Sequence, residues 1–206
     1  MEFSKEFITC QKGVGIAEGG WADSPNDKGK ETLFGVSRRW NPVWPGWIKV
    51  DAYAARLGRG SKAFILAVNS DAELKQLSYN LFFTNYWIPI QGDYLPLPVA
   101  RIIYDMSINS GPFEACELLG KVAADLGCTE KPAHKLMPGQ IKFIKAFYDS
   151  DKAGSFTKQL LLKRLSFYMG IVAKDQTQKA NWHSWMSRLQ ALAKETLGDA
   201  MKEVFK

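Results

Sequence analysis

Hydrophobic residues recur at helical spacing through most of this sequence, and the pattern predicts a mainly α-helical protein. The expected helices share apolar positions three or four residues apart and are bounded by glycine, proline or a capping residue. They cover residues 3–17, 51–57, 71–86, 99–110, 113–126, 140–148, 157–173 and 182–197. No internal repeat and no long linker interrupts this series.

Two sequence signals set expected helix boundaries. Gly19-Gly20 ends the first helix by supplying positive φ angles and removing side chains, so Glu18 is expected at a helix end, just before a glycine turn. The run Ser70-Asp71-Ala72-Glu73 predicts a capping box, in which Ser70 bonds a free amide and Glu73 bonds back.

Residues 19–50 differ from the rest because glycine and proline punctuate them. This composition predicts turns, with one short hairpin at about residues 21–36. Four tryptophans are interleaved with the turns: Trp21, Trp40, Trp44 and Trp47. Aromatic rings in a loop-rich region indicate a ligand surface more strongly than rings on a helix do.

Charge is uneven along the chain, although the net charge is only +6. Residues 1–139 hold 15 basic and 15 acidic side chains, whereas residues 140–206 hold 12 and 6. A basic last third favours an anionic partner: nucleic acid, anionic lipid or the acidic polymers of a cell wall. Charge alone does not choose among them, but no nucleic-acid-binding module is recognisable, so we expect no nucleic-acid partner.

Cysteines and the N-terminal residues bear on where the protein works. The three cysteines, Cys10, Cys116 and Cys128, cannot all pair within one chain, so reduced thiols are expected. No run approaches the roughly 18 apolar residues of a membrane span, and the charged residues 1–16 lack a signal-peptide pattern. We therefore expect synthesis in the cytoplasm and no stable membrane insertion. Action outside the membrane then requires a separate membrane pore.

The candidate chemistry lies between residues 18 and 32. Glycoside cleavage needs an acid that protonates the leaving oxygen, and a carboxylate or an activated water on the other face of the sugar. Glu18 at a helix end and Asp27 across a short loop could supply the two carboxyl groups, and the Thr32 hydroxyl could hold a water. Asp23 and Glu31 are alternative partners for Glu18.

A series of motifs in fixed order resembles glycoside hydrolase family 108, lysozyme-like enzymes that include phage endolysins. The matching residues are Glu18-Gly19-Gly20-Trp21, Asp27, Gly29, Thr32, Gly35-Val36, Tyr86-Trp87, Asp93, Leu95-Pro96, Pro98-Val99-Ala100, Tyr104-Asp105 and Asn109-Ser110-Gly111. Near the end, Arg164, Phe167-Tyr168, Trp182, Trp185 and Arg188 resemble an associated predicted peptidoglycan-binding region. The resemblance implies a lysozyme-like helical domain with a loop or small β-hairpin at the active site.

The resemblance also implies roles for individual residues. Glu18 is the expected general acid, Asp27 steers water or stabilises the sugar cation, and Thr32 helps to place that water. Asp105 and Asn109 share one helix face and either line the substrate groove or form a hydrogen-bond network that fixes the fold. Trp21 replaces the usual Tyr of the family and is an expected substrate contact. It is also a candidate wall that would raise the pKa of Glu18.

Residues 1–95 are the expected catalytic region and residues 96–206 the helical, wall-binding region, packed into the same body. The expected function is cleavage of the peptidoglycan glycan strand by a muramidase of the phage endolysin type, held in the host cytoplasm until release to the periplasm or cell wall. Thr32 as a water holder favours an inverting mechanism. Whether muramic acid or glucosamine lies at the new reducing end stays open.

Other functional classes find less support in the sequence. A zinc site is not expected because the only histidines, His134 and His183, stand far apart and no HExxH motif occurs. No metal or other cofactor is implied. The alternative from a different class is a non-catalytic wall-binding or virion structural protein, for which the basic, aromatic last third is suited.

Overall fold

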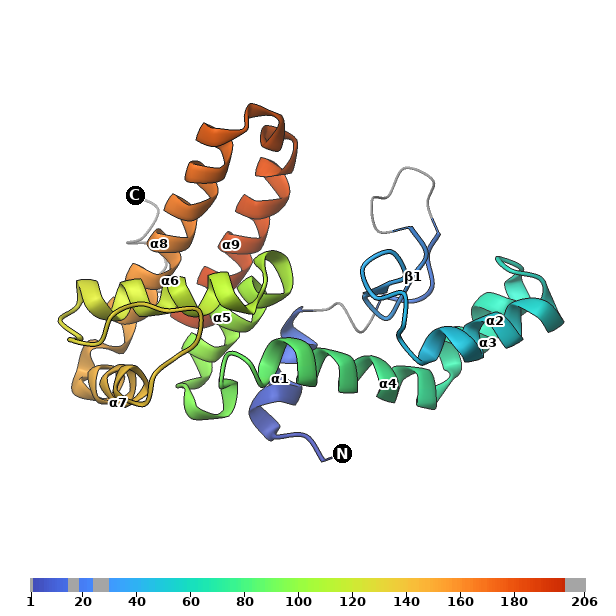
Figure 1. Cartoon of the computed structure of the whole chain (residues 1–206), viewed down its shortest axis with the longest axis horizontal. Helices are drawn as coiled ribbons and strands as arrows, with labels where there is room; N and C mark the ends of the chain where they lie inside the picture. Colours follow the sequence, from blue (N-terminus) through green and yellow to red (C-terminus); the bar gives the residue numbers. More distant parts are fainter. Residues whose placement is uncertain (1, 15–18, 24–29, 199–206) are drawn as a thin grey trace. The chain divides into compact units, whose positions relative to one another are not determined.

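A computed structural model of the chain describes residues 2–14, 19–23 and 30–198 (Figure 1). These residues are mainly helical and include one two-stranded antiparallel sheet, so the mainly α fold class is confirmed. The chain divides into two compact units, residues 1–85 and 86–206. Two expected catalytic residues, Glu18 and Asp27, lie outside the described residues.

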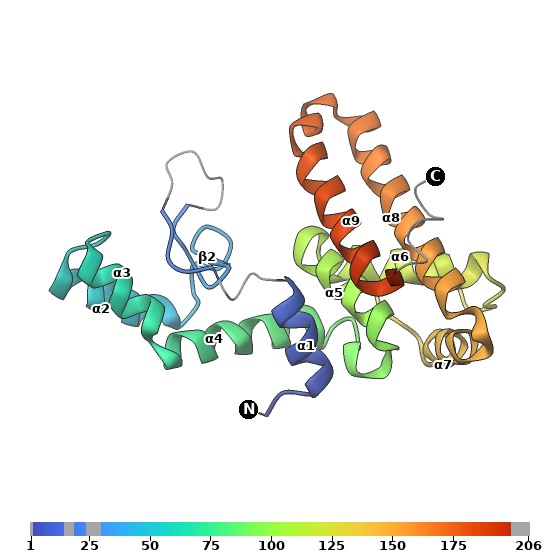
Figure 2. The same ribbon diagram turned by 180° about the vertical axis from the view of Figure 1, so that it is seen from behind.

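The first unit contains α1, the hairpin and three further helices. Their bounds are α1 Lys5–Val14, β1 Thr32–Leu33, β2 Val36–Ser37, α2 Gly46–Leu57, α3 Lys62–Ser70 and α4 Ala72–Phe82, followed by a π-helical turn, Phe83–Trp87. Aromatic packing holds α1 against α4 and the π-helical turn after it, because the ring centroid of Phe7 lies 6.2 Å from that of Tyr79 and 5.0 Å from that of Phe83. Helices α2 and α3 lie side by side (Figures 1 and 2).

Helix α4 has a different capping residue from the predicted one. Asp71 is the N-cap, and its Oδ1 accepts hydrogen bonds from the amides of Glu73 at 2.9 Å and Leu74 at 3.1 Å. Ser70 instead donates to the carbonyl of Leu66 at 2.8 Å, in the last turn of α3. The capping box predicted at Ser70 is therefore wrong, because the preceding helix already uses that hydroxyl.

The second unit is built around α5. Its elements are a 3-10 turn Gly92–Tyr94, α5 Leu97–Ser110, α6 Pro112–Asp125, α7 Pro138–Phe147, a π-helical turn Tyr148–Lys152, α8 Ala153–Lys174, a 3-10 turn Gln176–Asn181 and α9 Trp182–Leu197. Helices α6, α8 and α9 pack around α5, and α8 and α9 run side by side (Figures 1 and 2). As a result α5 is buried without a break from Val99 to Ser107.

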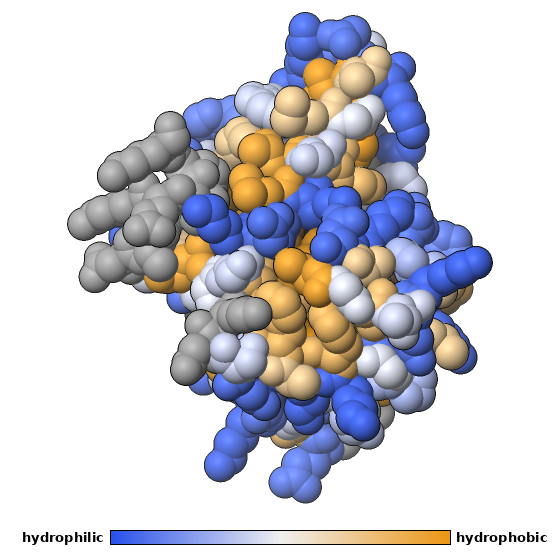
Figure 3. All heavy atoms as spheres, turned by 90° about the vertical axis from the view of Figure 1, so that its left-hand side faces the viewer, coloured by the Kyte–Doolittle hydropathy of each residue, from blue (hydrophilic) through white to orange (hydrophobic). Residues whose placement is uncertain are grey.

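The surface of the second unit is mixed in character. On the side shown in Figure 3, apolar side chains gather in patches that polar side chains border.

The buried face of α5 carries two charged residues, Arg101 and Asp105, which need partners inside the unit. Among the helices of the described ranges, none combines the length and apolar character of a bilayer-spanning segment.

Candidate active site

The hairpin holds the part of the site that follows Glu18 in sequence. Thr32 pairs with Ser37, and Leu33 with Val36. The two turn residues, Phe34 and Gly35, have φ angles of 48° and 79°, as a tight type I′ connection requires. The predicted hairpin is thus confirmed, and its paired strands occupy residues 32–37.

A backbone bridge joins the strand of Thr32 to the segment after the glycine turn. The amide of Ala22 donates to the carbonyl of Thr32 at 2.9 Å, and the amide of Thr32 donates back at 2.8 Å. This pair fixes the chain directly after Trp21 beside the strand that carries the expected water-holding hydroxyl.

The hydroxyl group of Thr32 donates one hydrogen bond and can still accept others. The side chain is half-buried, and its Oγ1 donates a hydrogen bond to the carbonyl of Lys30 at 3.2 Å. Because the proton points at Lys30, the oxygen lone pairs stay available as acceptors for a water or a sugar hydroxyl.

Trp21 is held by three side chains. Its backbone amide donates to Asn69 Oδ1 at 2.7 Å, and its indole Nε1 donates to Glu31 Oε1 at 2.8 Å. Its ring meets that of Phe64 edge to face, with centroids 5.2 Å apart. The neighbouring Gly20 is needed for close approach, since an added Cβ would lie 2.6 Å from Asn69 Nδ2.

The expectation of a positive φ is therefore wrong for Gly20. Its backbone lies outside the left-handed region, and the absence of a side chain is what lets Asn69 reach the backbone of Trp21.

Asp23 and Glu31 are the two described alternatives for the second carboxylate. Of the two, Glu31 has the more extensive contacts with other groups. It is buried, and it accepts from the Trp21 indole and from Arg59 Nη1. Its other oxygen lies 2.7 Å from Arg38 Nε. With three positively polarised groups around its two oxygens, this carboxylate is poorly placed to act as a base or nucleophile.

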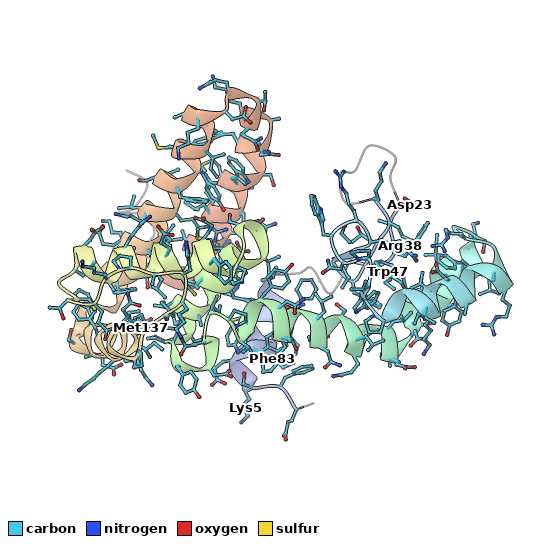
Figure 4. The ribbon with its side chains drawn as sticks, in the orientation of Figure 1. Lys5, Asp23, Arg38, Trp47, Phe83 and Met137 are labelled. Atoms are coloured by element: carbon cyan, nitrogen blue, oxygen red, sulfur yellow. The ribbon has the colours of Figure 1, made fainter. Side chains whose placement is uncertain are left out.

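The two arginines around Glu31 also share Asp51. Arg38 donates through Nη1 to Asp51 Oδ2 at 3.1 Å and through Nη2 to Oδ1 at 2.7 Å, and Arg59 donates to the same Oδ1. The Arg38 guanidinium also lies 4.4 Å from the centre of the Trp47 ring (Figure 4). Hydrogen bonding from Arg38, against the opposing effect of partial burial, lowers the pKa of Asp51, and Arg59 adds to the effect.

Asp23 keeps an uncommitted carboxylate. It is exposed beside the bridged residue Ala22, and within the described part of the chain it has no hydrogen-bond partner. Of the two described alternatives, Asp23 is therefore the freer one.

The tryptophans of the loop region fall into distinct environments. Trp44 and Trp47 are buried, and their indole nitrogens donate to the carbonyls of Leu77 and Asn41. Trp40 is 68% exposed, with the Arg39 guanidinium 5.1 Å from its ring centre. Four rings were expected at a ligand surface: Trp21, Trp40, Trp44 and Trp47. Of these four, only Trp40 is widely exposed to solvent.

Asp105 and Asn109 lie in the second unit and contact each other. Asn109 Nδ2 donates to the carbonyl of Asp105 at 2.8 Å and to its Oδ1 at 3.3 Å. Asp105 is almost fully buried and accepts from Arg164 at 2.5 Å and from Arg188 at 2.9 Å. Both carboxylate oxygens are therefore occupied, which favours the fold-fixing alternative for Asp105.

The aromatic and basic residues near the end of the chain complete this network. Arg164 is fully buried, and its Nε donates to the Tyr168 hydroxyl at 2.9 Å. The Tyr168 ring stacks on that of Trp185, with centroids 4.7 Å apart and an interplanar angle of 10°. Burial raises the pKa of the Tyr168 hydroxyl, and the adjacent Arg164 opposes that shift.

Trp182 lies apart from that network, in an apolar groove of about 490 Å³ at the end of the α8–α9 hairpin. The groove is lined by Met169, Val172, Ala173, Gln176, Lys179 and Trp182. An indole and an ammonium group beside apolar side chains could receive the face and the acidic substituents of a sugar.

Sequence reasoning missed Asn69, Arg59 and Arg101. Asn69 and Arg59 contact residues 48 and 28 positions away, so no local pattern points to them. Arg101 is buried and pairs with Glu195 at 2.9 Å. Its spacing of four from Asp105 was the one available signal. The described residues contain no group of three or more His, Cys, Asp or Glu side chains able to hold a metal.

Comparisons with known proteins agree with this architecture. The structure of Brucella abortus SagA aligns with 93% of this chain and 93% of its own, with a TM-score of 0.61 and 24% sequence identity, a likeness of fold. No curated protein sequence matches significantly. Residues 12–111 match the family described as Glycosyl hydrolase 108, a stretch that contains Glu18, Asp27, Thr32, Asp105 and Asn109. Residues 12–111 thus belong to glycosyl hydrolase family 108, which indicates a glycoside hydrolase that acts on peptidoglycan.

Proposed function

We propose that this protein is a muramidase that cleaves the glycan strand of peptidoglycan, with Glu18 as the general acid. In this mechanism Glu18 protonates the glycosidic oxygen as the bond to the leaving sugar breaks. Asp27 stabilises the developing sugar cation or activates the attacking water, and Thr32 accepts a hydrogen bond from that water. Asp23 and Glu31 are the alternatives to Asp27, and we favour Asp23 because two donors and the Arg38 guanidinium already surround Glu31.

The backbone bridge between Ala22 and Thr32 is the observation that carries this proposal. Glu18 and Thr32 stand 14 positions apart in the sequence. The bridge brings the strand of Thr32 beside the segment that begins three residues after Glu18. A glycosidase of this type needs its acid and its water-holding group at the same bond, and the bridge supports that arrangement.

The second unit suits a role in holding the wall polymer. The groove containing Trp182 and Lys179 supports binding of glycan or its acidic substituents. The same observation supports the alternative of a non-catalytic wall-binding or virion protein. In our proposal residues 1–95 carry the catalytic motif, and residues 96–206 add wall affinity. Trp21 and Asn109 contribute substrate contacts.

We further propose that the enzyme acts as a phage endolysin, released from the host cytoplasm through a separate pore, and inverts the anomeric centre. Inversion requires the two carboxyl groups to stand about 6.5–9.5 Å apart, whereas retention requires about 5–5.5 Å. Proton NMR of the freshly released sugar distinguishes the two outcomes.

Glu18→Gln tests the catalytic proposal, because glutamine keeps the shape of the side chain but has no proton to give. We expect the variant to fold normally and to release no reducing ends from purified walls. Mass spectrometry of wild-type digests should find muramic acid at the new reducing end. A folded variant that still clears walls would refute the role of Glu18, and wall binding without cleavage by the wild-type protein would favour the alternative.

A further inference from the structure

Two side chains from outside the motif fix the position of Trp21, three residues after Glu18. Asn69, at the end of α3, accepts the backbone amide of Trp21 at 2.7 Å, and Glu31 accepts its indole nitrogen at 2.8 Å. A chain spans at most about 3.6 Å per residue. Fixing Trp21 therefore anchors the glycine turn, Gly19-Gly20, which joins Trp21 to Glu18 in the sequence.

Glu31 owes its own orientation to groups on two other elements. Arg38 follows β2, and Arg59 lies between α2 and α3. Both arginines are also tied to Asp51 on α2. Two carboxylates and two guanidinium groups thus balance in charge, and a buried carboxylate with these partners has little freedom to turn. Among the described residues, the Trp21 indole is the neutral group that donates to Glu31.

Two further residues lie against the half-buried ring of Trp21. Phe64 meets it at an interplanar angle of 87°. Gly60, whose φ is +77°, lies so close that an added Cβ would approach the ring at 3.5 Å. The side chain is therefore held by a bond at its nitrogen and by packing at its far edge, as a rigid element of the site would be.

We propose that Glu31 is a positioning residue for the glycosidase site and acts through Trp21, together with Asn69. The inference rests on the proposed function for its effect on rate. Glu31 moves no proton in the reaction: its carboxylate is paired with the two arginines and orients the indole. The indole and the Asn69 bond together fix the glycine turn after the general acid.

Steady-state kinetics on soluble glycan oligomers of peptidoglycan test the proposal with Glu31→Gln, Trp21→Phe and the double variant. Trp21→Phe keeps the ring against Phe64 and removes only the indole donor. We expect each single variant to lower kcat/KM about tenfold, because small misplacements of reacting groups carry such costs. The double variant should be no worse than Glu31→Gln, since both changes break the same bond. Both limbs of the pH–kcat profile should stay where they are.

Two kinetic outcomes would overturn the proposal. Loss of one limb of the pH profile in Glu31→Gln would make Glu31 itself the second catalytic carboxylate. Independent effects that multiply in the double variant would show that Glu31 does not act through Trp21. If Glu31→Gln does not fold, Trp21→Phe still removes the Glu31 bond, and Asn69→Leu and Asn69→Asp test the second anchor of Trp21 from an exposed position. Asp retains the acceptor and should keep the wild-type rate, whereas Leu should not.

The indole N–H resonance of Trp21 gives a readout independent of activity. It is the cross-peak missing from the ¹⁵N spectrum of Trp21→Phe. In Glu31→Gln we expect this peak to move upfield and its proton to exchange faster with water. An unchanged peak would refute the proposal even if Glu18 proves to be the acid. A shifted peak together with an active Glu18→Gln variant would instead refute the proposed function alone.

The chain offers a matched control in its other unit. The Trp87 indole donates to Asp93 Oδ1 at 2.8 Å, the same chemistry at the same length as the Trp21–Glu31 bond. Asp93→Asn should lower stability with no change in kcat or KM. An equal kinetic loss in this control would show that weakening any indole–carboxylate pair lowers activity. That result would refute the positioning role of Glu31.

Discussion

Asp105 and Arg164 form an ion pair of 2.5 Å in which both side chains are almost entirely buried, and the pair joins α5 to α8. Two more arginines, Arg101 and Arg188, face the same carboxylate at 3.8 and 2.9 Å. Arg101 is in turn paired with Glu195 on α9. Asp105 is therefore the central anion of a network that links three helices.

Asp105→Ala should destabilise the protein by about 3–5 kcal/mol, because it leaves buried guanidinium groups without their counter-charge. Urea denaturation followed by circular dichroism measures this loss. Asn109→Ala, at an exposed position that also bonds Asp105, should cost less than about 1.5 kcal/mol. A stable Asp105→Ala protein with weakened substrate binding would instead support the groove-lining role for Asp105.

The first unit should lose stability in acid through Asp51 and Asp71. The pKa of Asp71 is lowered because hydrogen bonds from Lys49, the Leu74 amide and Tyr53 outweigh its burial, and that of Asp51 is lowered chiefly by Arg38. A carboxyl group whose pKa is lower in the folded state stabilises the fold above its unfolded value of about 3.9. The contribution disappears as the pH falls through the folded value.

We therefore expect the urea midpoint to fall steadily below about pH 4. Asp71→Asn keeps an acceptor for the cap of α4 but cannot titrate, so it should flatten part of this decline. Asp71→Ala also removes the cap and should cost about 1 kcal/mol more at neutral pH. A decline of equal steepness in Asp71→Asn would show that other groups dominate the acid response.

Gly20→Ala should impair the site more than the fold. The added Cβ would lie within 2.9 Å of three side-chain atoms of Asn69, so Asn69 must move and release the Trp21 amide. We expect a lower kcat/KM with a thermal midpoint close to that of the wild type. In an Asn69→Ala background the same change should have little further effect. Additive losses there would mean that Gly20 matters for another reason.

The thiol of Cys116 should resist alkylation in the folded protein. Burial raises its pKa to about 11, so only roughly one thiol in a thousand is ionised at pH 8. Cys128 is half-buried, and Cys10 is buried. Mass spectrometry after brief iodoacetamide treatment should find Cys128 modified first, and all three only after denaturation. Early modification of Cys116 would contradict its burial.

Trp40→Ala should weaken substrate binding with little effect on stability. Its ring is 68% exposed, with the Arg39 guanidinium beside it, so truncation removes little packing. We expect a higher KM with an unchanged kcat, because an exposed ring stacks on a sugar away from the bond that breaks. Val43→Ala, at a still more exposed apolar position (92%) three residues along the chain, is the control and should behave like the wild type.

Local patterns were sufficient to predict most of the helices. Helix α9 runs from Trp182 to Leu197, as its apolar spacing predicts. Helix α3 was missed because residues 63–68 form a continuous apolar run, which does not distinguish a helix from a buried strand. Its N-cap was nonetheless readable, since Ser61 accepts the amide of Phe64 at 3.1 Å. Helix α2 begins at Gly46 rather than at residue 51, just after Pro45.

The candidate site was less predictable than the helices. The motif order pointed to Glu18, Trp21 and Thr32, and the hairpin shows how the later two are connected. The partners that constrain Trp21 and Glu31 come from α3 and from the segment before it, and only tertiary packing brings them there. Periodicity describes which face of an element is apolar, and it is silent about which polar groups meet across elements.

The Glycosyl hydrolase 108 match ends at Gly111, whereas the second compact unit begins at Tyr86. The inherited sequence unit therefore does not coincide with either structural unit. A chimera made by joining two relatives at residue 85 would separate α5 from the motif with which it is inherited. A junction after Gly111 would instead replace Arg164 and Arg188, the partners of Asp105, with the residues that the other relative has at those positions. Productive recombination within this family is thus expected to exchange the chain whole, or to carry the arginines along with α5.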